Sequence, residues 1–163
     1  MGELIDFASY SGSLPRTGRL LNLSPLEAHY FLAHGALLVD LREAYETNFR
    51  VFDVVEVSFL PWTRFSACFD SLPRDRPLIL VDAAGIYGKE AACILLEAGY
   101  SNLANLVGGM IDWDREGFPV RKDVEYELGG QCACKLKTRT GGNPLKDKRT
   151  GSGDGRHGGG HEC

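Results

Sequence analysis

The chain has 163 residues, of which 44% are hydrophobic and 25% charged, with a net charge of −4. This composition is typical of a globular protein of about one domain. It contains no apolar run near the ~20 residues that a membrane span needs, and its first residues lack the basic and apolar regions of a signal peptide. We therefore expect a cytoplasmic protein that does not bind membranes.

The charge is unevenly distributed along the chain. Residues 1–128 contain 11 Lys and Arg against 19 Asp and Glu, a balance of −8, whereas residues 129–163 contain 7 against 3, a balance of +4. The acidic body argues against nucleic-acid binding. The basic end is rich in glycine and cannot bury enough apolar surface to fold, so we expect residues 136–162 to be mostly disordered.

Taken in chain order, the sequence alternates helices and strands after an irregular arm at residues 1–20. Ser24, Pro25 and Glu27 predict a helix start, because serine can cap, proline fits the first turn and glutamate completes a capping box. That helix should end near Gly35. Strands are expected at 36–40, 54–59, 77–82 and 103–106, and further helices at 43–49, 65–71, 87–97 and 110–115. The alternation predicts an α/β domain with a central parallel sheet covered on both faces.

Three motifs occur in the order in which a known family has them. Gly108 and Gly109 open a helix that carries Trp113, Asp40 and Arg42 form an Asp-x-Arg element, and the segment 23–27 is similar to the first helix cap. By these motifs the chain resembles the rhodanese-like family over about 100 residues. The resemblance implies a three-layer domain with about five central strands at 21–122, between the arm at 1–20 and a tail at 123–163.

The most consequential departure from the family lies in the loop that follows the strand at 77–82. Family members that transfer sulfur have a cysteine directly after this strand, and the register set by Gly85 puts Asp82 there. Tyr87 and Gly88 stand where the family often has arginine and serine. The resemblance thus implies an active-site loop made of Asp82, Ala83, Ala84, Gly85, Ile86, Tyr87 and Gly88. In the family, the cysteine becomes a persulfide stabilised by backbone N–H groups, which a carboxylate cannot do.

Asp82 has three interpretations. It could fill the anion cradle of the loop with its own charge, or it could simply cap the helix at 87–97, and the two overlap because a cap is also an anion in a cradle. It could instead act as an acid, a base or a covalent nucleophile. That role needs a partner base, a metal or a phosphate clamp, and Lys89 is the nearest cation in the sequence.

Thiol chemistry is therefore expected elsewhere in the chain. Cys68 and Cys93 have apolar neighbours on predicted helices, and we expect both to be inert core residues. Cys132 and Cys134 precede two lysines, which favour thiolate. A sulfur carrier that uses these two thiols is thus a possible function.

The tail also contains a set of residues that could ligate a metal. Cys132, Cys134, His157, His161 and Cys163 could hold zinc or another thiophilic ion, although a free tail with incidental ligands is the alternative. Two function classes follow from the sequence. The first is a non-catalytic module that binds a protein partner or a small thiol or sulfur compound, and the second is a persulfide carrier or sulfurtransferase.

Overall fold

A five-stranded parallel sheet lies at the centre of the computed structural model, which describes residues 6–123. The strand order is β1-β6-β5-β2-β4. The strands are β1 (Leu21–Leu23), β2 (Leu37–Asp40), β4 (Val57–Phe59), β5 (Leu78–Val81) and β6 (Leu103–Leu106). The register pairs Asp40 with Val81 and Leu80 with Asn105, so the three inner strands end close to one another at one edge.

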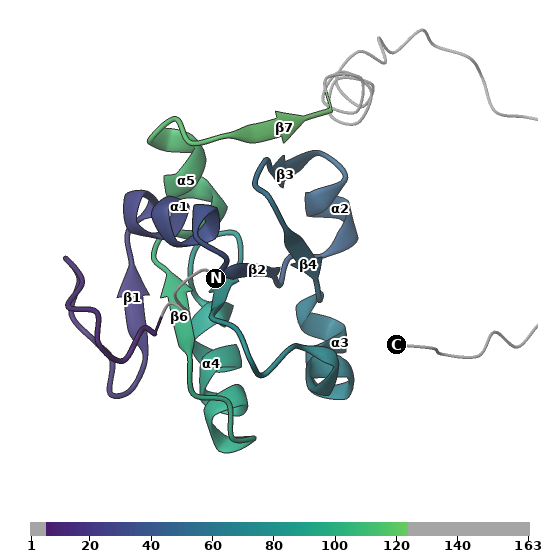
Figure 1. Cartoon of the computed structure of the whole chain (residues 1–163). Helices are drawn as coiled ribbons and strands as arrows, with labels where there is room; N and C mark the ends of the chain where they lie inside the picture. Colours follow the sequence, from purple (N-terminus) through teal and green to yellow (C-terminus); the bar gives the residue numbers. More distant parts are fainter. Residues whose placement is uncertain (1–5, 124–163) are drawn as a thin grey trace, which may run out of the picture.

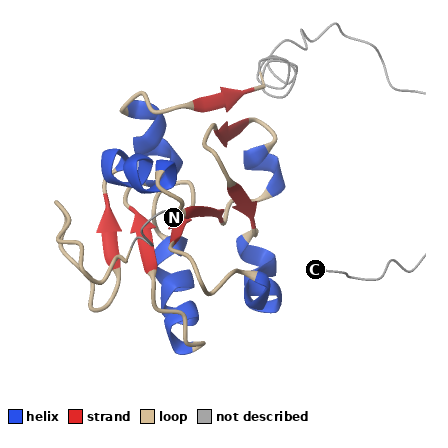
Figure 2. Cartoon of the chain, viewed as in Figure 1, coloured by secondary structure: helices blue, strands red, loops and turns tan. Residues whose placement is uncertain are grey.

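Helices cover both faces of this sheet (Figures 1 and 2). They are α1 (Pro25–Ala33), α2 (Ala44–Thr47), α3 (Trp62–Cys68) with a 3₁₀ turn at Phe69–Ser71, α4 (Tyr87–Glu97) and α5 (Gly109–Arg115). Apolar side chains of α1 and α5 pack on one face, including Phe31 and Trp113. Those of α3 and α4, including Phe65 and Leu95, pack on the other. The predicted three-layer α/β fold with about five parallel strands is confirmed.

The first helix begins as the sequence predicts. The backbone N–H of Glu27 bonds the Ser24 hydroxyl oxygen, while the Glu27 carboxylate accepts from the Ser24 backbone N–H at 2.9 Å. Pro25 occupies the first turn, where its missing N–H costs nothing. This capping box fixes the point at which the chain leaves β1 and crosses the sheet.

Four strands differ from the prediction. The three-residue strand β1 was not expected, because so short a run carries no periodicity. The strand expected at 54–59 forms only at Val57–Phe59, since its first residues belong to a connection. A separate antiparallel ribbon joins β3 (Arg50–Phe52) to β7 (Val120–Lys122), two segments far apart in sequence.

The arm before β1 packs against α1. The rings of Phe7 and Tyr10 meet Phe31 edge to face, with centroid distances of 5.0 and 4.8 Å. The Glu27 carboxylate accepts from the Tyr10 hydroxyl at 3.1 Å and from the Ser13 N–H at 2.6 Å. Burial acts to raise the pKa of Glu27, but the hydrogen bonds from Ser13 and Ser24 outweigh it and lower the pKa to about 2.

No helix among residues 6–123 has the length and apolar character that crossing a membrane would require.

Candidate functional site

The loop between β5 and α4 lies at the edge where the inner strands end. Open α/β sheets bind ligands at this edge, because the connections that leave the strands there can shape a site. Asp82 is the first residue after β5 and is only 4% exposed. The seven loop residues singled out in the sequence, 82 to 88, therefore form one continuous turn into the first residues of α4.

The Asp82 carboxylate accepts three backbone hydrogen bonds from its own loop. One oxygen accepts from the N–H of Gly85, and the other accepts from the N–H of Ile86 at 3.0 Å and of Tyr87 at 2.8 Å. These donors lie at the start of an eleven-residue helix, whose dipole also favours a negative charge. The carboxylate thus takes up donors that an external anion would otherwise find there.

Two glycines allow the loop and the start of α5 to approach each other closely. Gly85 has φ +81°, and a Cβ added there would lie 2.9 Å from the backbone nitrogen of Gly108. A Cβ at Gly109 would overlap the carbonyl oxygen of Asp82. The start of α5 can therefore rest on the loop, where the N–H of Met110 donates to the Asp82 carbonyl at 3.0 Å.

Gly88 has a packing reason to be glycine. It is buried in the first turn of α4, and a Cβ there would overlap the side-chain oxygen of Asn105 on β6. Asn105 is itself completely buried. Close contact between α4 and the sheet therefore leaves no room for the serine that the family often has at this position.

The Asp40 and Arg42 motif serves the β3–β7 ribbon. The two side chains form a buried ion pair at 2.6 Å, and the Arg42 guanidinium also donates to the backbone carbonyl of Arg50 at 2.9 Å. It lies 5.2 Å from the centre of the Phe52 ring. Within residues 6–123, no hydrogen bond or ion pair joins this pair to the Asp82 side chain, so the motif holds β3 rather than the loop.

Trp113 is a core residue on the face of the sheet that α1 and α5 cover. Its side chain is fully buried, and its indole N–H donates to the carbonyl of Pro119 at 3.0 Å. The ring contacts those of Phe52 and Phe118, with centroids 5.4 and 4.9 Å away. Trp113 therefore connects α5 to the ribbon and does not face the loop.

The sequence did not identify two residues that lie beside the loop. The indole of Trp62, at the start of α3, stacks on the Tyr87 ring with centroids 5.0 Å apart and 25° between the planes. Glu43 accepts from the Thr63 N–H at 3.1 Å, next to that indole. The signal that could have found them is position, since both follow a parallel strand whose end lies at the loop edge.

The prediction that Cys93 is a core residue is wrong. Its side chain is exposed on α4, because the buried stripe of that helix runs through Gly88, Ala91, Ala92 and Leu95. Cys68 is buried, as expected, but it is disulfide-bonded and is therefore not the free core thiol that the sequence predicted. The remaining thiols and the predicted metal ligands, namely Cys132, Cys134, His157, His161 and Cys163, lie outside the described residues. Within 6–123, no group of three or more metal-ligating side chains comes together.

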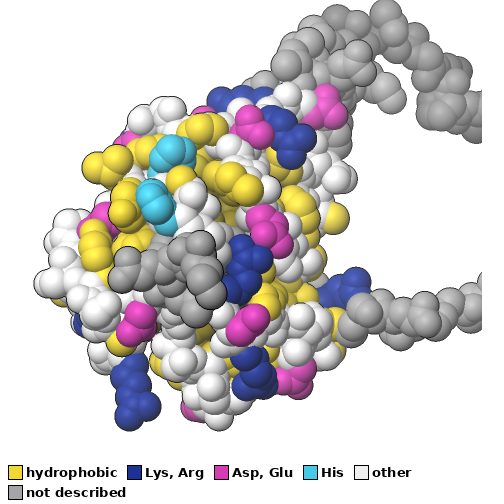
Figure 3. All heavy atoms as spheres, in the orientation of Figure 1, with side chains coloured by type: hydrophobic (Ala, Val, Ile, Leu, Met, Phe, Trp, Pro, Cys, Tyr) yellow, Lys and Arg dark blue, Asp and Glu magenta, His cyan; other side chains and the backbone are white. Residues whose placement is uncertain are grey.

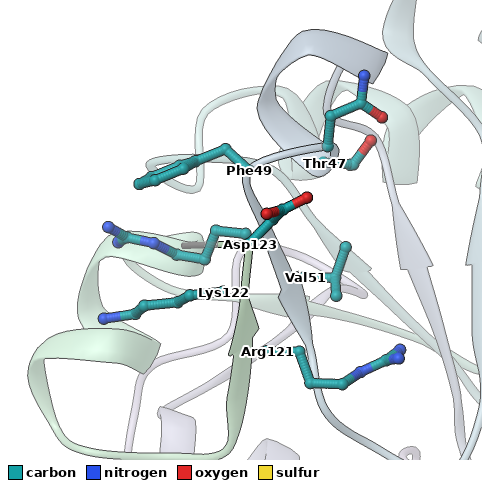
Figure 4. A pocket seen from close by; sticks show the side chains of 8 residues that line it. Thr47, Phe49, Val51, Arg121, Lys122 and Asp123 are labelled. Atoms are coloured by element: carbon teal, nitrogen blue, oxygen red, sulfur yellow. The ribbon is translucent and has the colours of Figure 1, made fainter. Parts of the chain in front are cut away.

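A separate pocket of about 400 Å³ lies between α2 and the ribbon (Figure 4). It is lined by Thr47, Asn48, Phe49, Arg50, Val51, Arg121, Lys122 and Asp123. Its cations already have acidic partners, since Arg50 and Lys122 both contact Asp114 and Arg121 contacts Asp53. In Figure 4, Arg121 and Lys122 also extend to opposite sides of β7. The pocket therefore lacks a converging set of free charges, and no loop residue reaches it.

Comparison with known proteins relates the chain to sulfurtransferases. No family model matches it. It is 32% identical over 108 residues to the thiosulfate sulfurtransferase GlpE of Haemophilus influenzae. The aligned region covers 64% of this chain and 95% of GlpE. It is 31% identical over 84 residues to a sulfurtransferase of Allochromatium vinosum, covering 52% and 77% of the two chains.

Solved structures with the same fold include a rhodanese-related protein from Thermoplasma volcanium, at 22% identity and a TM-score of 0.57, covering 63% of this chain and 99% of that one. The polysulfide-sulfur transferase homodimer from Wolinella succinogenes gives 22% identity and a TM-score of 0.59, covering 67% and 83%. The match to GlpE covers nearly all of that protein, and the fold agrees with it. The chain therefore belongs to the single-domain rhodanese-like sulfurtransferase family.

Proposed function

We propose that this rhodanese-like domain is a binding module that does not transfer sulfur at its loop. The observation that carries the proposal is the position of the Asp82 carboxylate, which is buried and holds three loop N–H groups. By the resemblance, active members are expected to have their cysteine at this position. A carboxylate is a weak nucleophile toward sulfur and forms no persulfide, so the loop lacks the group that the reaction needs.

The same carboxylate also opposes anionic substrates. Thiosulfate would need the donors of Gly85, Ile86 and Tyr87, which Asp82 already occupies. It would also meet a like charge in a buried setting, where repulsion is weakly screened. Both effects act against binding before any chemistry begins, and they support a role in holding a protein partner or a neutral sulfur compound.

The test is thiocyanate formation from thiosulfate and cyanide by the full chain. Because Cys93 is exposed, the decisive protein carries Cys93→Ser together with Cys132→Ser, Cys134→Ser and Cys163→Ser. We expect no turnover above the uncatalysed rate. Thiocyanate formation that survives these four substitutions and disappears in Asp82→Asn would overturn the proposal, because the loop would then be catalytic.

A second candidate function is a persulfide carrier that uses Cys132 and Cys134. It is favoured by membership of a family whose relatives are named sulfurtransferases and by the lysines at 135 and 137, which favour thiolate. Treatment with polysulfide tests it, because a thiolate can attack a sulfane sulfur of polysulfide and become a persulfide while the shortened polysulfide leaves. The product is trapped with iodoacetamide and mapped by mass spectrometry. Sulfane sulfur on either tail cysteine supports the carrier, whereas sulfur on Cys93 alone contradicts it.

A further inference from the structure

An exposed aromatic and aliphatic surface borders the loop. It consists of Trp62, Ile86 and Tyr87, which we call the aromatic ledge. Ile86 is 69% exposed and Tyr87 45% exposed, while Trp62 is half-buried between Tyr87 and Phe65, whose ring stacks behind it at 5.6 Å. The ring of Tyr87 is thus supported from one side and open to solvent elsewhere.

Carboxylates flank the ledge. Glu43 lies next to Trp62, because both of its oxygens accept hydrogen bonds from Thr63, at 3.1 and 3.2 Å. Glu90 is exposed and follows Tyr87 by three residues on α4, which places the two side chains on the same side of the helix. Lys89 follows Tyr87 by only two residues, and side chains two apart on a helix do not face each other.

We propose that the aromatic ledge docks a basic segment of a partner protein. A lysine or arginine side chain would lie on the Tyr87 ring, where the ring face attracts a cation, and its charge would meet Glu43 or Glu90. A neighbouring apolar side chain would cover Ile86. The inference deepens the proposed role as a binding module and rests on it. Residues 6–123 contain 11 Lys and Arg against 16 Asp and Glu, so the overall field also attracts a basic partner.

A second exposed apolar surface provides an internal comparison. On α1, Leu26 and Tyr30 are exposed beside His34, whose ring lies 4.1 Å from that of Tyr30. Figure 3 shows histidine and apolar side chains gathered on this part of the surface. The acidic residue of α1 is Glu27, and its carboxylate is held by the arm and by Ser24. Helix α1 itself therefore contributes aromatic exposure without a free carboxylate beside it, so this surface should not select a basic segment.

The experiment uses the full chain and two synthetic acetylated hexapeptides, one alternating leucine with arginine and the other alternating leucine with glutamate. Trp113 is fully buried, so a change in acrylamide quenching of tryptophan fluorescence reports on Trp62. The arginine peptide should protect Trp62 and shift the amide resonances of Ile86 and Tyr87. The glutamate peptide should do neither, and added salt should weaken the arginine peptide's binding.

Matched variants make the test specific. Tyr87→Ser and Glu90→Gln should each weaken binding of the arginine peptide about three- to tenfold. Tyr30→Ser and Glu97→Gln, which make the same changes on α1 and at the far end of α4, should bind as the unmodified protein does. Equal binding by all four variants, or by both peptides, would overturn the inference.

The result is separable from the test of the proposed function. Failure of the arginine peptide to bind, in a protein that makes no thiocyanate, would overturn the ledge alone. Thiocyanate formation at the loop would overturn the proposed function, whatever the peptide does.

Discussion

The backbone N–H of Tyr87 donates to the Asp82 carboxylate at 2.8 Å, while the Tyr87 ring stacks on Trp62. One residue therefore connects the charge at the base of the loop with the aromatic surface at its rim. A change at Asp82 should consequently affect the order of the loop as well as its chemistry. Stability measurements can test this connection directly.

Asp82→Asn should destabilise the domain by about 1–3 kcal/mol at pH 7, because it weakens charge-assisted hydrogen bonds from three backbone donors to a buried carboxylate. The free energy of unfolding in urea measures the effect. Asp75→Asn, at an exposed position between the 3₁₀ turn and β5, is the control and should change little. Equal stability of both variants would mean that the charge of Asp82 contributes nothing to the loop.

Gly109→Ala should be more damaging than a conformational argument alone suggests. Gly109 has φ +57°, and a Cβ there would overlap the Asp82 carbonyl, so we expect a loss of about 2–4 kcal/mol. Gly117→Ala is the matched control, since Gly117 has φ +81° but no described atom within 4 Å of an added Cβ. It should cost about 1 kcal/mol. Similar losses in the two variants, compared by thermal unfolding, would contradict the close approach of α5.

Glu27→Gln should release the arm in a pH-dependent way. The folded pKa of Glu27 is about 2, below its ordinary value of 4.5, so the stabilisation is complete above pH 4.5 and is lost as pH falls through 2. We expect the variant to be about 1–3 kcal/mol less stable at pH 7, after allowing for solvent screening of a partly exposed group. Denaturant titrations of both proteins from pH 7 to pH 2 should converge. A constant difference would show that the charge of Glu27 is not responsible.

Asp82→Cys should give the loop a reactive thiol. The donors of Gly85, Ile86 and Tyr87 would favour the thiolate, which attacks the outer sulfur of thiosulfate and expels sulfite, leaving a persulfide. Mass spectrometry after thiosulfate treatment should find one added sulfur on the introduced residue. Asp82→Ser is the control without a thiol. Absence of the persulfide in a folded variant would mean that the loop lacks more than its nucleophile.

We also predict that the tail binds zinc. Zinc should bind the reduced full chain more tightly than a Cys132→Ser, Cys134→Ser variant, because thiolates are the strongest zinc ligands available there. Isothermal titration of both proteins measures the difference. If the two bind zinc equally, the histidines and Cys163 act without this pair, or the tail is not a metal site.

The sequence predicted β6 and α4 to the residue and β5 to within one residue at each end. The apolar run before Asp82 and the helical pattern between Tyr87 and Gly99 are signals carried by neighbouring residues. Such signals are enough to predict where β5 and α4 form. Gly88 shows the limit of such signals. The sequence shows only that Gly88 departs from the family pattern. The reason for a glycine there is its close contact with Asn105, which lies on β6 and is far away in sequence.

The contacts that define the rim could not be predicted in the same way. Trp62 and Tyr87 belong to different helices, and only the folded sheet brings them to 5.0 Å. The apolar sequence neighbours of Cys93 predict a core position for it. On a helix, however, burial follows positions three and four apart, and Cys93 lies off the stripe that passes through Ala92 and Leu95.

The β3–β7 ribbon has a consequence for the order of folding. Phe52 pairs with Val120, and on the far edge of the sheet Leu21 pairs with Ala104. Closing such long loops costs conformational entropy before the contacts form, which slows folding. During synthesis on the ribosome, β3 and the Arg42 side chain that supports it cannot pair with β7 until almost the whole domain has been synthesised. A nascent chain stalled before residue 120 should therefore expose Phe52, and chaperones that bind apolar segments should recognise that intermediate.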